Sequence, residues 1–139
     1  MKGRGAVRGV CAVLGAFLCG AFCYALARMP AFGGTGYEFS CGASSSARIV
    51  RTDAPVFYKL THPVAGESAR FTGDVSEELL LAYRARVLFC EEADGVRSYY
   101  CYSPLLGEGI LLNGVRVNLH IAAGKGQTAA GTPVIFGGW

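Results

Sequence analysis

One long uncharged and mostly apolar stretch, VCAVLGAFLCGAFCYALA from Val10 to Ala27, restricts what the N-terminus can form. Lys2, Arg4 and Arg8 precede it, and a basic start followed by an apolar core is typical of an export signal. Its eighteen residues would span roughly 27 Å as a helix at ~1.5 Å per residue, close to the thickness of a bilayer core. We therefore expect a membrane-directed helix with its basic end in the cytoplasm and the rest of the chain outside.

Two fates of this helix fit the sequence. A retained helix would make a single-pass cell-membrane protein that contacts the membrane through residues 10–27. Ala25, Leu26 and Ala27 also match the small-x-small pattern of a signal-peptidase site, so cleavage after Ala27 would give a secreted protein. A buried core helix is a third reading of the same segment. We expect residues 1–30 to be the export signal or anchor, residues 31–46 a flexible linker with a first strand, and residues 47–139 a small α+β domain.

The charge is divided unevenly between these parts. The chain has a formal net charge of +3, but from Arg28 onward ten basic residues balance ten acidic ones. The excess positive charge therefore belongs to the leader. A neutral domain lacks the electrostatic attraction that phosphate backbones exert on basic proteins, so we expect no nucleic-acid partner.

Cysteine usage argues against a metal centre. Outside the leader only Cys41, Cys90 and Cys101 remain, and no CxxC pair exists. Three dispersed cysteines and two histidines lack the ligand spacing of zinc sites, so neither a metal nor another cofactor is expected. Cys90 and Cys101 flank a turn and could form a disulfide, with two buried free thiols as the alternative.

One amphipathic helix is predicted in the domain. Asp74 followed by Glu77 forms a capping-box pattern, and apolar residues then recur at helical spacing between Val75 and Ala85. A helix of about three turns is too short to be stable alone, so it should pack on a sheet.

The remaining pattern is mostly β. Three segments before the helix are expected as strands: Gly36–Cys41, Arg48–Val50 and Pro55–Leu60. After the helix, residues 86–92 and 96–103 should pair across an Asp-Gly turn, and residues 110–122 contain the hairpin signal Asn113-Gly114. A last strand is expected at Pro133–Phe136. The predicted fold class is α+β: an N-terminal transmembrane or signal helix, then a small, mainly antiparallel sheet with one packed helix.

The segment GKGQT, Gly124–Thr128, has some likeness to a phosphate-binding loop. Such a loop needs Ser or Thr directly after the lysine, a glycine five residues before the Gly-Lys pair, and a following helix. Here Gly126 follows Lys125, Leu119 occupies the earlier position, and no helix is expected afterwards. GKGQT is therefore predicted to be a turn between two antiparallel strands.

The strand around Val117 suggests a contact surface. Val117, Leu119 and Ile121 alternate with three polar residues, which predicts one dry face and one wet face. Tyrosines on a neighbouring strand would extend the wet face if the two strands pair. Such a surface suits contact with protein or glycan, although the tyrosines could instead fill a small core. The hypothesised surface comprises Tyr100, Tyr102, Arg116, Asn118 and His120.

Catalytic signals are weak. Ser103 lies in Tyr-Ser-Pro rather than in the G-x-S-x-G motif of a hydrolase nucleophile. Cys101 with His120 could make a thiol–imidazole pair, so a small hydrolase or thiol enzyme remains the alternative to a non-catalytic domain.

Three short motifs resemble a known family: Tyr102-Ser103-Pro104, the strand Asn118–Ala122 with the sequence NLHIA, and Gly131–Ile135 with the sequence GTPVI. Together with the leader they make the chain similar to the YwmB-like proteins of spore-forming Gram-positive bacteria. The resemblance covers residues 75–139. It implies a TATA-box-binding-like fold label and a role in sporulation or the cell envelope, and it implies no catalytic residues. DNA binding, which the label suggests, is the third functional hypothesis, because the domain is neutral and preceded by an export signal.

Overall fold

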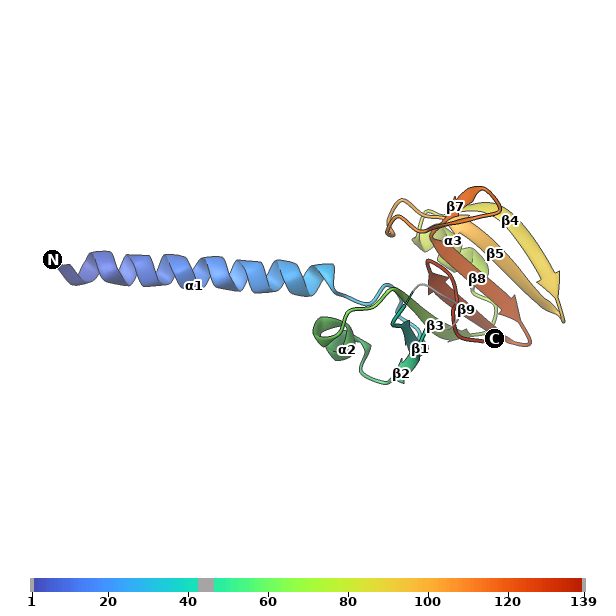
Figure 1. Cartoon of the computed structure of the whole chain (residues 1–139), viewed down its shortest axis with the longest axis horizontal. Coiled ribbons are helices and arrows are strands. Elements are labelled where there is room, and N and C mark those ends of the chain that lie inside the picture. Colours follow the sequence, from blue (N-terminus) through green and yellow to red (C-terminus); the bar gives the residue numbers. More distant parts are fainter. Residues whose placement is uncertain (1, 43–46, 139) are drawn as a thin grey trace.

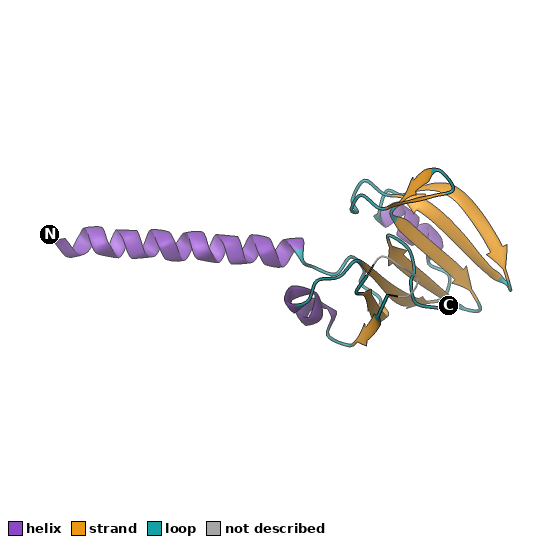
Figure 2. Ribbon diagram, viewed as in Figure 1, coloured by secondary structure: helices purple, strands orange, loops and turns teal. Residues whose placement is uncertain are grey.

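The chain begins with one long helix, α1 (Lys2–Ala27), which projects from the rest of the molecule as a rod (Figure 1). The computed structural model describes residues 2–42 and 47–138. Its second part is a sheet with two short helices, shown in Figure 2. The predicted α+β class with an N-terminal apolar helix is confirmed at this level.

The sheet has seven strands in the order β2-β1-β3-β9-β8-β5-β4, and every neighbouring pair is antiparallel. Its strands are β1 (Thr35–Ser40), β2 (Ile49–Thr52), β3 (Gly66–Thr72), β4 (Arg86–Ala93), β5 (Val96–Tyr102), β8 (Leu119–Gly124) and β9 (Gln127–Thr132). A separate ribbon pairs β6 (Ile110–Leu112) with β7 (Val115–Val117).

Three hairpins have the turn chemistry that the sequence predicts. Asp94-Gly95, Asn113-Gly114 and Lys125-Gly126 all have positive φ at both positions. Two consecutive positive φ values define the tight turn whose twist matches that of paired strands. GKGQT therefore joins β8 to β9 and is a turn, as expected.

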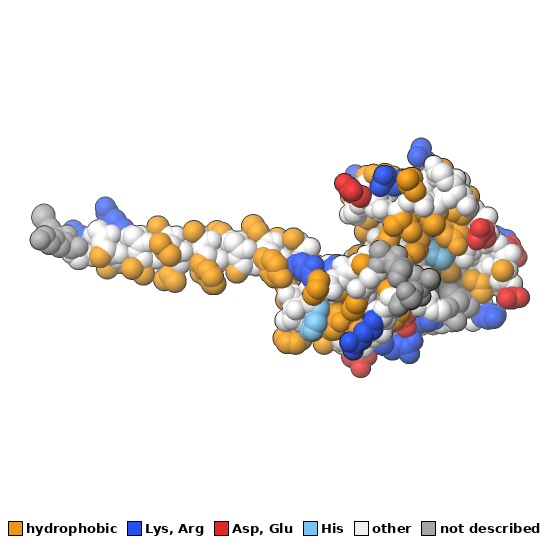
Figure 3. Space-filling model, in the orientation of Figure 1, with side chains coloured by type: hydrophobic (Ala, Val, Ile, Leu, Met, Phe, Trp, Pro, Cys, Tyr) orange, Lys and Arg blue, Asp and Glu red, His pale blue; other side chains and the backbone are white. Residues whose placement is uncertain are grey.

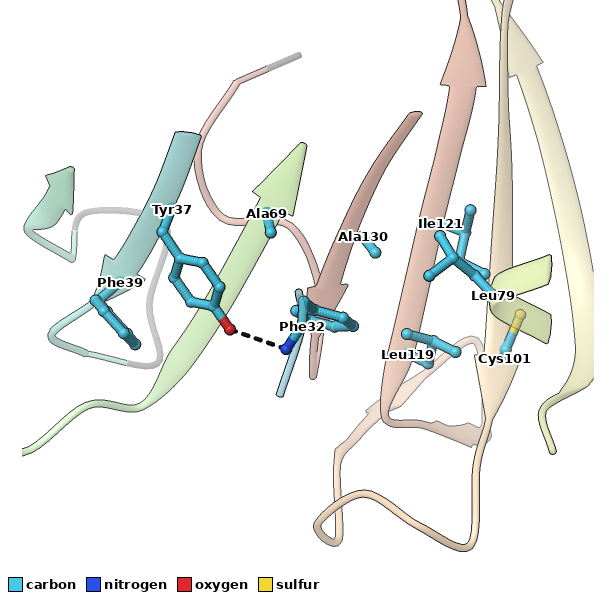
Figure 4. Packing of buried hydrophobic residues seen from close by; sticks show 9 residues of the cluster. All are labelled: Phe32, Tyr37, Phe39, Ala69, Leu79, Cys101, Leu119, Ile121 and Ala130. Atoms are coloured by element: carbon cyan, nitrogen blue, oxygen red, sulfur yellow. Dashed lines mark hydrogen bonds between the residues drawn. The ribbon is translucent and has the colours of Figure 1, made fainter. Parts of the chain in front are cut away.

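The hydrophobic core lies on one face of the sheet. Helix α3 (Ser76–Ala82) covers this face through Leu79, and Phe32 enters the core from the segment that follows α1. Figure 4 shows the cluster: Phe32, Tyr37, Phe39, Ala69, Leu79, Cys101, Leu119, Ile121 and Ala130. The backbone N–H of Phe32 donates to the Tyr37 hydroxyl at 3.0 Å, also drawn in Figure 4.

The C-terminal segment, residues 133–138, crosses the opposite face of the sheet. Glycines permit this close approach: a Cβ on Gly131 would lie 2.8 Å from the Ile135 backbone nitrogen, and one on Gly66 would lie 2.7 Å from the Phe136 ring. The Ile135 N–H donates to His120 Nδ1 at 3.3 Å. Both faces of the sheet centre are thus covered.

Several sequence expectations are wrong in detail. Pro55–Leu60 is part of helix α2 (Pro55–Thr61) rather than a strand, with Pro55 in the first turn, where its missing N–H is tolerated. Residues 133–136 are not a strand, because the last strand, β9, ends at Thr132. Helix α3 spans Ser76–Ala82, shorter than predicted, and Asp74 accepts from the Ser76 N–H at 3.1 Å just outside it.

The predicted flexible linker is also wrong at its start. Phe32 is only 5 % exposed and packs in the core, so the chain leaving α1 is fixed to the domain. The rest of the expectation falls partly on residues 43–46, which lie outside the described residues.

Candidate functional site

An aromatic row crosses the sheet face opposite α3. The rings of Phe89, Tyr100 and His120, on adjacent strands β4, β5 and β8, stack with centroids 4.5 and 4.4 Å apart. Tyr100 is the register partner of His120, as expected if the two strands paired. Burial and the nearby Glu91 carboxylate raise the pKa of Tyr100. The row is therefore a neutral aromatic surface at neutral pH.

His120 is more buried than the sequence predicts. The Tyr100 ring covers one face and the C-terminal segment reaches Nδ1. Its Nε2 has no hydrogen-bond partner among the described residues. Burial lowers the pKa of His120 to about 4, so the imidazole is neutral near pH 7.

The prediction that Asn118 lies on the wet face of its strand is wrong. Asn118 is fully buried, because β7 ends at Val117 and β8 begins at Leu119, and the break turns the amide inward. Its Oδ1 accepts from the Ser103 N–H at 2.7 Å, while Nδ2 donates to the carbonyls of Ser103 and Gly107 at 2.7 and 2.8 Å. Asn118 fixes the β7–β8 corner and offers nothing to a partner.

The other members of the hypothesised surface lie apart. Arg116 is exposed on the separate β6–β7 ribbon, where Nη1 donates to the Glu108 carbonyl at 3.3 Å. Tyr102 is 37 % exposed at the end of β5, opposite Arg86. Only Tyr100 and His120 are brought together, and both are partly covered.

The Cys101–His120 pair does not form. Cys101 points into the core beside Leu119, whereas His120, one residue further along β8, faces the other side of the sheet. Burial raises the pKa of the Cys101 thiol to about 12, and a catalytic thiol needs the opposite shift. This geometry gives the thiol-enzyme hypothesis no support.

Cys90 and Cys101 are free thiols rather than a disulfide. The register of the β4–β5 hairpin places Cys90 opposite Tyr99 and Cys101 opposite Val87. The two cysteines are therefore offset along the hairpin, with Cys90 exposed and Cys101 buried.

A different cluster joins α1 to the domain. The Tyr24 hydroxyl donates to the Leu60 carbonyl at 3.0 Å. Arg28 donates through Nε to the Lys59 carbonyl at 2.9 Å and through Nη2 to the His62 carbonyl. Lys59 Nζ in turn donates a hydrogen bond to the Met29 carbonyl at 2.9 Å. The last turn of α1 and the C-terminal end of α2 therefore form one connected junction.

Glu67 on β3 is the buried anion of this junction. Its carboxylate is 2.5 Å from Lys59 Nζ and accepts from the Tyr37 hydroxyl at 2.9 Å and from the Ala31 N–H. The Glu67 side chain is 5 % exposed and that of Lys59 is 14 % exposed. Burial and the Glu67 charge raise the pKa of Tyr37, which keeps its hydroxyl a hydrogen-bond donor.

A cleft of about 320 Å³ lies beside the junction. Its wall combines both charges of the Lys59–Glu67 pair with Arg28 and Glu108, and apolar groups complete it: Val64, Ile110, Pro133 and Phe136. Its charged groups of both signs can hold polar ligands. Among residues 2–42 and 47–138, no three His, Cys, Asp or Glu side chains are grouped closely enough to hold a metal ion.

Comparison of the chain with protein-family models, with curated proteins and with solved structures finds no match. The resemblance to YwmB-like proteins therefore stays a hypothesis based on its three short motifs.

The junction is the part that the sequence analysis misses. A usable signal exists: Pro55 can open a helix, and Tyr58 and His62 recur four residues apart, as one helix face requires. The two rings indeed stack at 4.3 Å.

Proposed function

We propose that this chain is an exported, non-catalytic domain held at the outer surface of the cell membrane by α1, where it contacts a protein or glycan of the cell envelope. The observation that carries the proposal is the exposure of α1. The most apolar 18 residues of the helix Gly3–Ala27 have a mean hydropathy of 2.2, and none of them is buried against the domain. An apolar helix of this length is stable only when another phase or partner covers it.

The junction supports a retained anchor over a cleaved signal. Tyr24, before the Ala27 cleavage position, and Arg28, after it, both hydrogen-bond to the end of α2. Cleavage would remove the Tyr24–Leu60 bond and separate the helix from the domain. The resemblance to YwmB-like proteins is compatible with an envelope or sporulation role, which belongs to the same proposal.

A reporter fusion tests export. Alkaline phosphatase, active only outside the cytoplasm, is fused to the C-terminus, and a fluorescent protein that folds only inside serves as the matched fusion. We expect phosphatase activity without fluorescence, and intact mass from the membrane fraction should include residues 1–27. Activity of the cytoplasmic reporter alone would refute export, and a mass beginning at Arg28 would establish the secreted form.

A further inference from the structure

We propose that helix α2 lies in the membrane surface, with Phe57 and Val56 inserted between the headgroups of the leaflet from which α1 emerges. This inference rests on the proposed anchoring function and adds to it a fixed orientation of the domain. The partner that covers the exposed face of α2 is the same bilayer that surrounds α1.

The first step is the attachment of α2 to α1. Tyr24 of α1, and Arg28 and Met29 directly after it, hydrogen-bond to α2. The Tyr24 hydroxyl donates to the Leu60 carbonyl at 3.0 Å, Arg28 Nε to the Lys59 carbonyl at 2.9 Å, and Lys59 Nζ to the Met29 carbonyl at 2.9 Å. Figure 1 shows α2 alongside the end of α1 rather than at the distal end of the domain. The depth of α2 in any membrane is therefore set by the depth of Tyr24.

The second step is the depth of Tyr24 in the bilayer. Arg4 and Arg8 stay at the opposite boundary, so the uncharged residues 10–27 span the bilayer. They would reach ~27 Å at ~1.5 Å per residue, close to a hydrocarbon core of ~30 Å. The last turn of α1, with Tyr24, therefore lies at the boundary with the headgroups. Tyrosine, arginine and lysine are the residues that membrane proteins place at this boundary.

The third step is the outer face of α2. Its inner face packs on the domain through Tyr58, whose ring stacks on Phe39 at 5.2 Å. Phe57 points away and is 70 % exposed, and Val56 is 42 % exposed. Figure 3 shows hydrophobic side chains gathered over α2 at the end of the domain nearest α1, close to the apolar surface of α1. A large exposed aromatic at interfacial depth buries its ring in the acyl boundary.

The consequence is a domain with a set orientation. With α1 through the bilayer and α2 lying on its surface, the sheet has two points of attachment. The cleft lined by Arg28 and Lys59 then lies next to the headgroups.

Tryptophan quenching by brominated lipids tests the inference on the full chain. Trp139, the only tryptophan, is replaced by Phe, and single tryptophans are introduced as Phe17→Trp, Phe57→Trp or Leu81→Trp. Phe17 lies within α1, and Leu81 is the matched control because it is 80 % exposed on α3, away from α1 (Figure 1). Each protein is reconstituted into vesicles of phosphatidylcholine and phosphatidylglycerol carrying bromine either near the headgroup or near the bilayer centre.

Phe57→Trp should lose emission with bromine near the headgroup and shift to shorter wavelength on reconstitution. Phe17→Trp should respond most to bromine near the centre, and Leu81→Trp to neither. If Phe17→Trp is quenched but Phe57→Trp, like Leu81→Trp, is not, the docking of α2 is overturned and the anchor stands. Quenching in Phe57→Trp without quenching in Phe17→Trp would support surface docking and refute the spanning anchor, and the loss of both signals would overturn both proposals.

Discussion

At the scale of single residues, His120 links pH to folding. Burial lowers its pKa to about 4 from 6.5. The unfolded chain therefore binds a proton more readily than the folded chain, and folding stability falls as the pH drops from about 6.5 to about 4. The full effect is about 3 kcal/mol, because each pKa unit corresponds to roughly 1.4 kcal/mol.

The check is a series of denaturant melts between these pH values, comparing the parent chain with His120→Asn. Acidic groups titrate in the same range and contribute equally to both proteins. We expect the parent to lose about 3 kcal/mol more than the variant. Parallel loss in the two proteins would show that His120 is not the responsible group.

Asn118 gives a second residue-level prediction. Asn118→Ala should lower the free energy of unfolding by about 2–4 kcal/mol, because it leaves the buried Ser103 N–H without an acceptor and removes two further hydrogen bonds, to the Ser103 and Gly107 carbonyls. Arg116→Ala, two positions away and exposed, is the matched control and should stay within about 0.5 kcal/mol. Thermal or urea melts of both variants measure the difference, and equal small effects would contradict the buried role of Asn118.

At the scale of elements, the sequence predicts the hairpin turns better than the strands and helices around them. Asp94-Gly95 and Asn113-Gly114 impose turns locally, since two consecutive positive φ values suit few residue pairs. The last strand is placed too late, at Pro133–Phe136, because the sequence of β9, QTAAGT, has little β propensity. Small residues are needed there because the core covers one face and the C-terminal segment approaches Gly131 on the other.

The misassigned helix α2 has a related cause. Val56, Phe57 and Tyr58 favour strands intrinsically, but the stacking of Tyr58 between Phe39 and His62 and the bonds to α1 stabilise the helix. Contacts between residues distant in sequence therefore determine that this segment is a helix rather than a strand. The same holds for the junction, whose members Arg28, Lys59 and Glu67 meet only after folding.

The buried Lys59–Glu67 pair should couple α2 to β3. Lys59→Met leaves the Glu67 carboxylate buried without its counter-ion, and we expect a loss of roughly 3 kcal/mol. Adding Glu67→Gln removes that charge, so the double variant should be more stable than the sum of the single effects predicts. The exposed Arg97–Glu92 pair is the matched control: water screens its charges, so Arg97→Ala should cost far less than Lys59→Met. Additive effects in the Lys59–Glu67 cycle would rule out coupling.

At the scale of the whole molecule, charge and hydrophobicity are separated along the chain. The leader carries the net positive charge, and the domain from Arg28 onward is formally neutral. The full chain in detergent should therefore show no submicromolar binding to duplex DNA with a steep salt slope. A fluorescence-anisotropy titration at two salt concentrations checks this, and such binding would restore the DNA-binding hypothesis.

The final prediction concerns the partition of the molecule between membrane and water. Leu14 and Phe17 lie in the middle of α1, 56 and 72 % exposed, with no contact to the domain that a substitution would disturb. Leu14→Arg with Phe17→Arg places two charges near the bilayer centre, at about 2.5–3.5 kcal/mol each on the insertion scale. The double variant should be released by alkaline carbonate extraction, whereas the parent stays with the membranes. Leu81→Arg with Leu111→Arg, at exposed apolar positions of the domain, should change nothing in this assay. Release of both double variants alike would mean that general surface hydrophobicity, rather than a spanning α1, holds the protein to membranes.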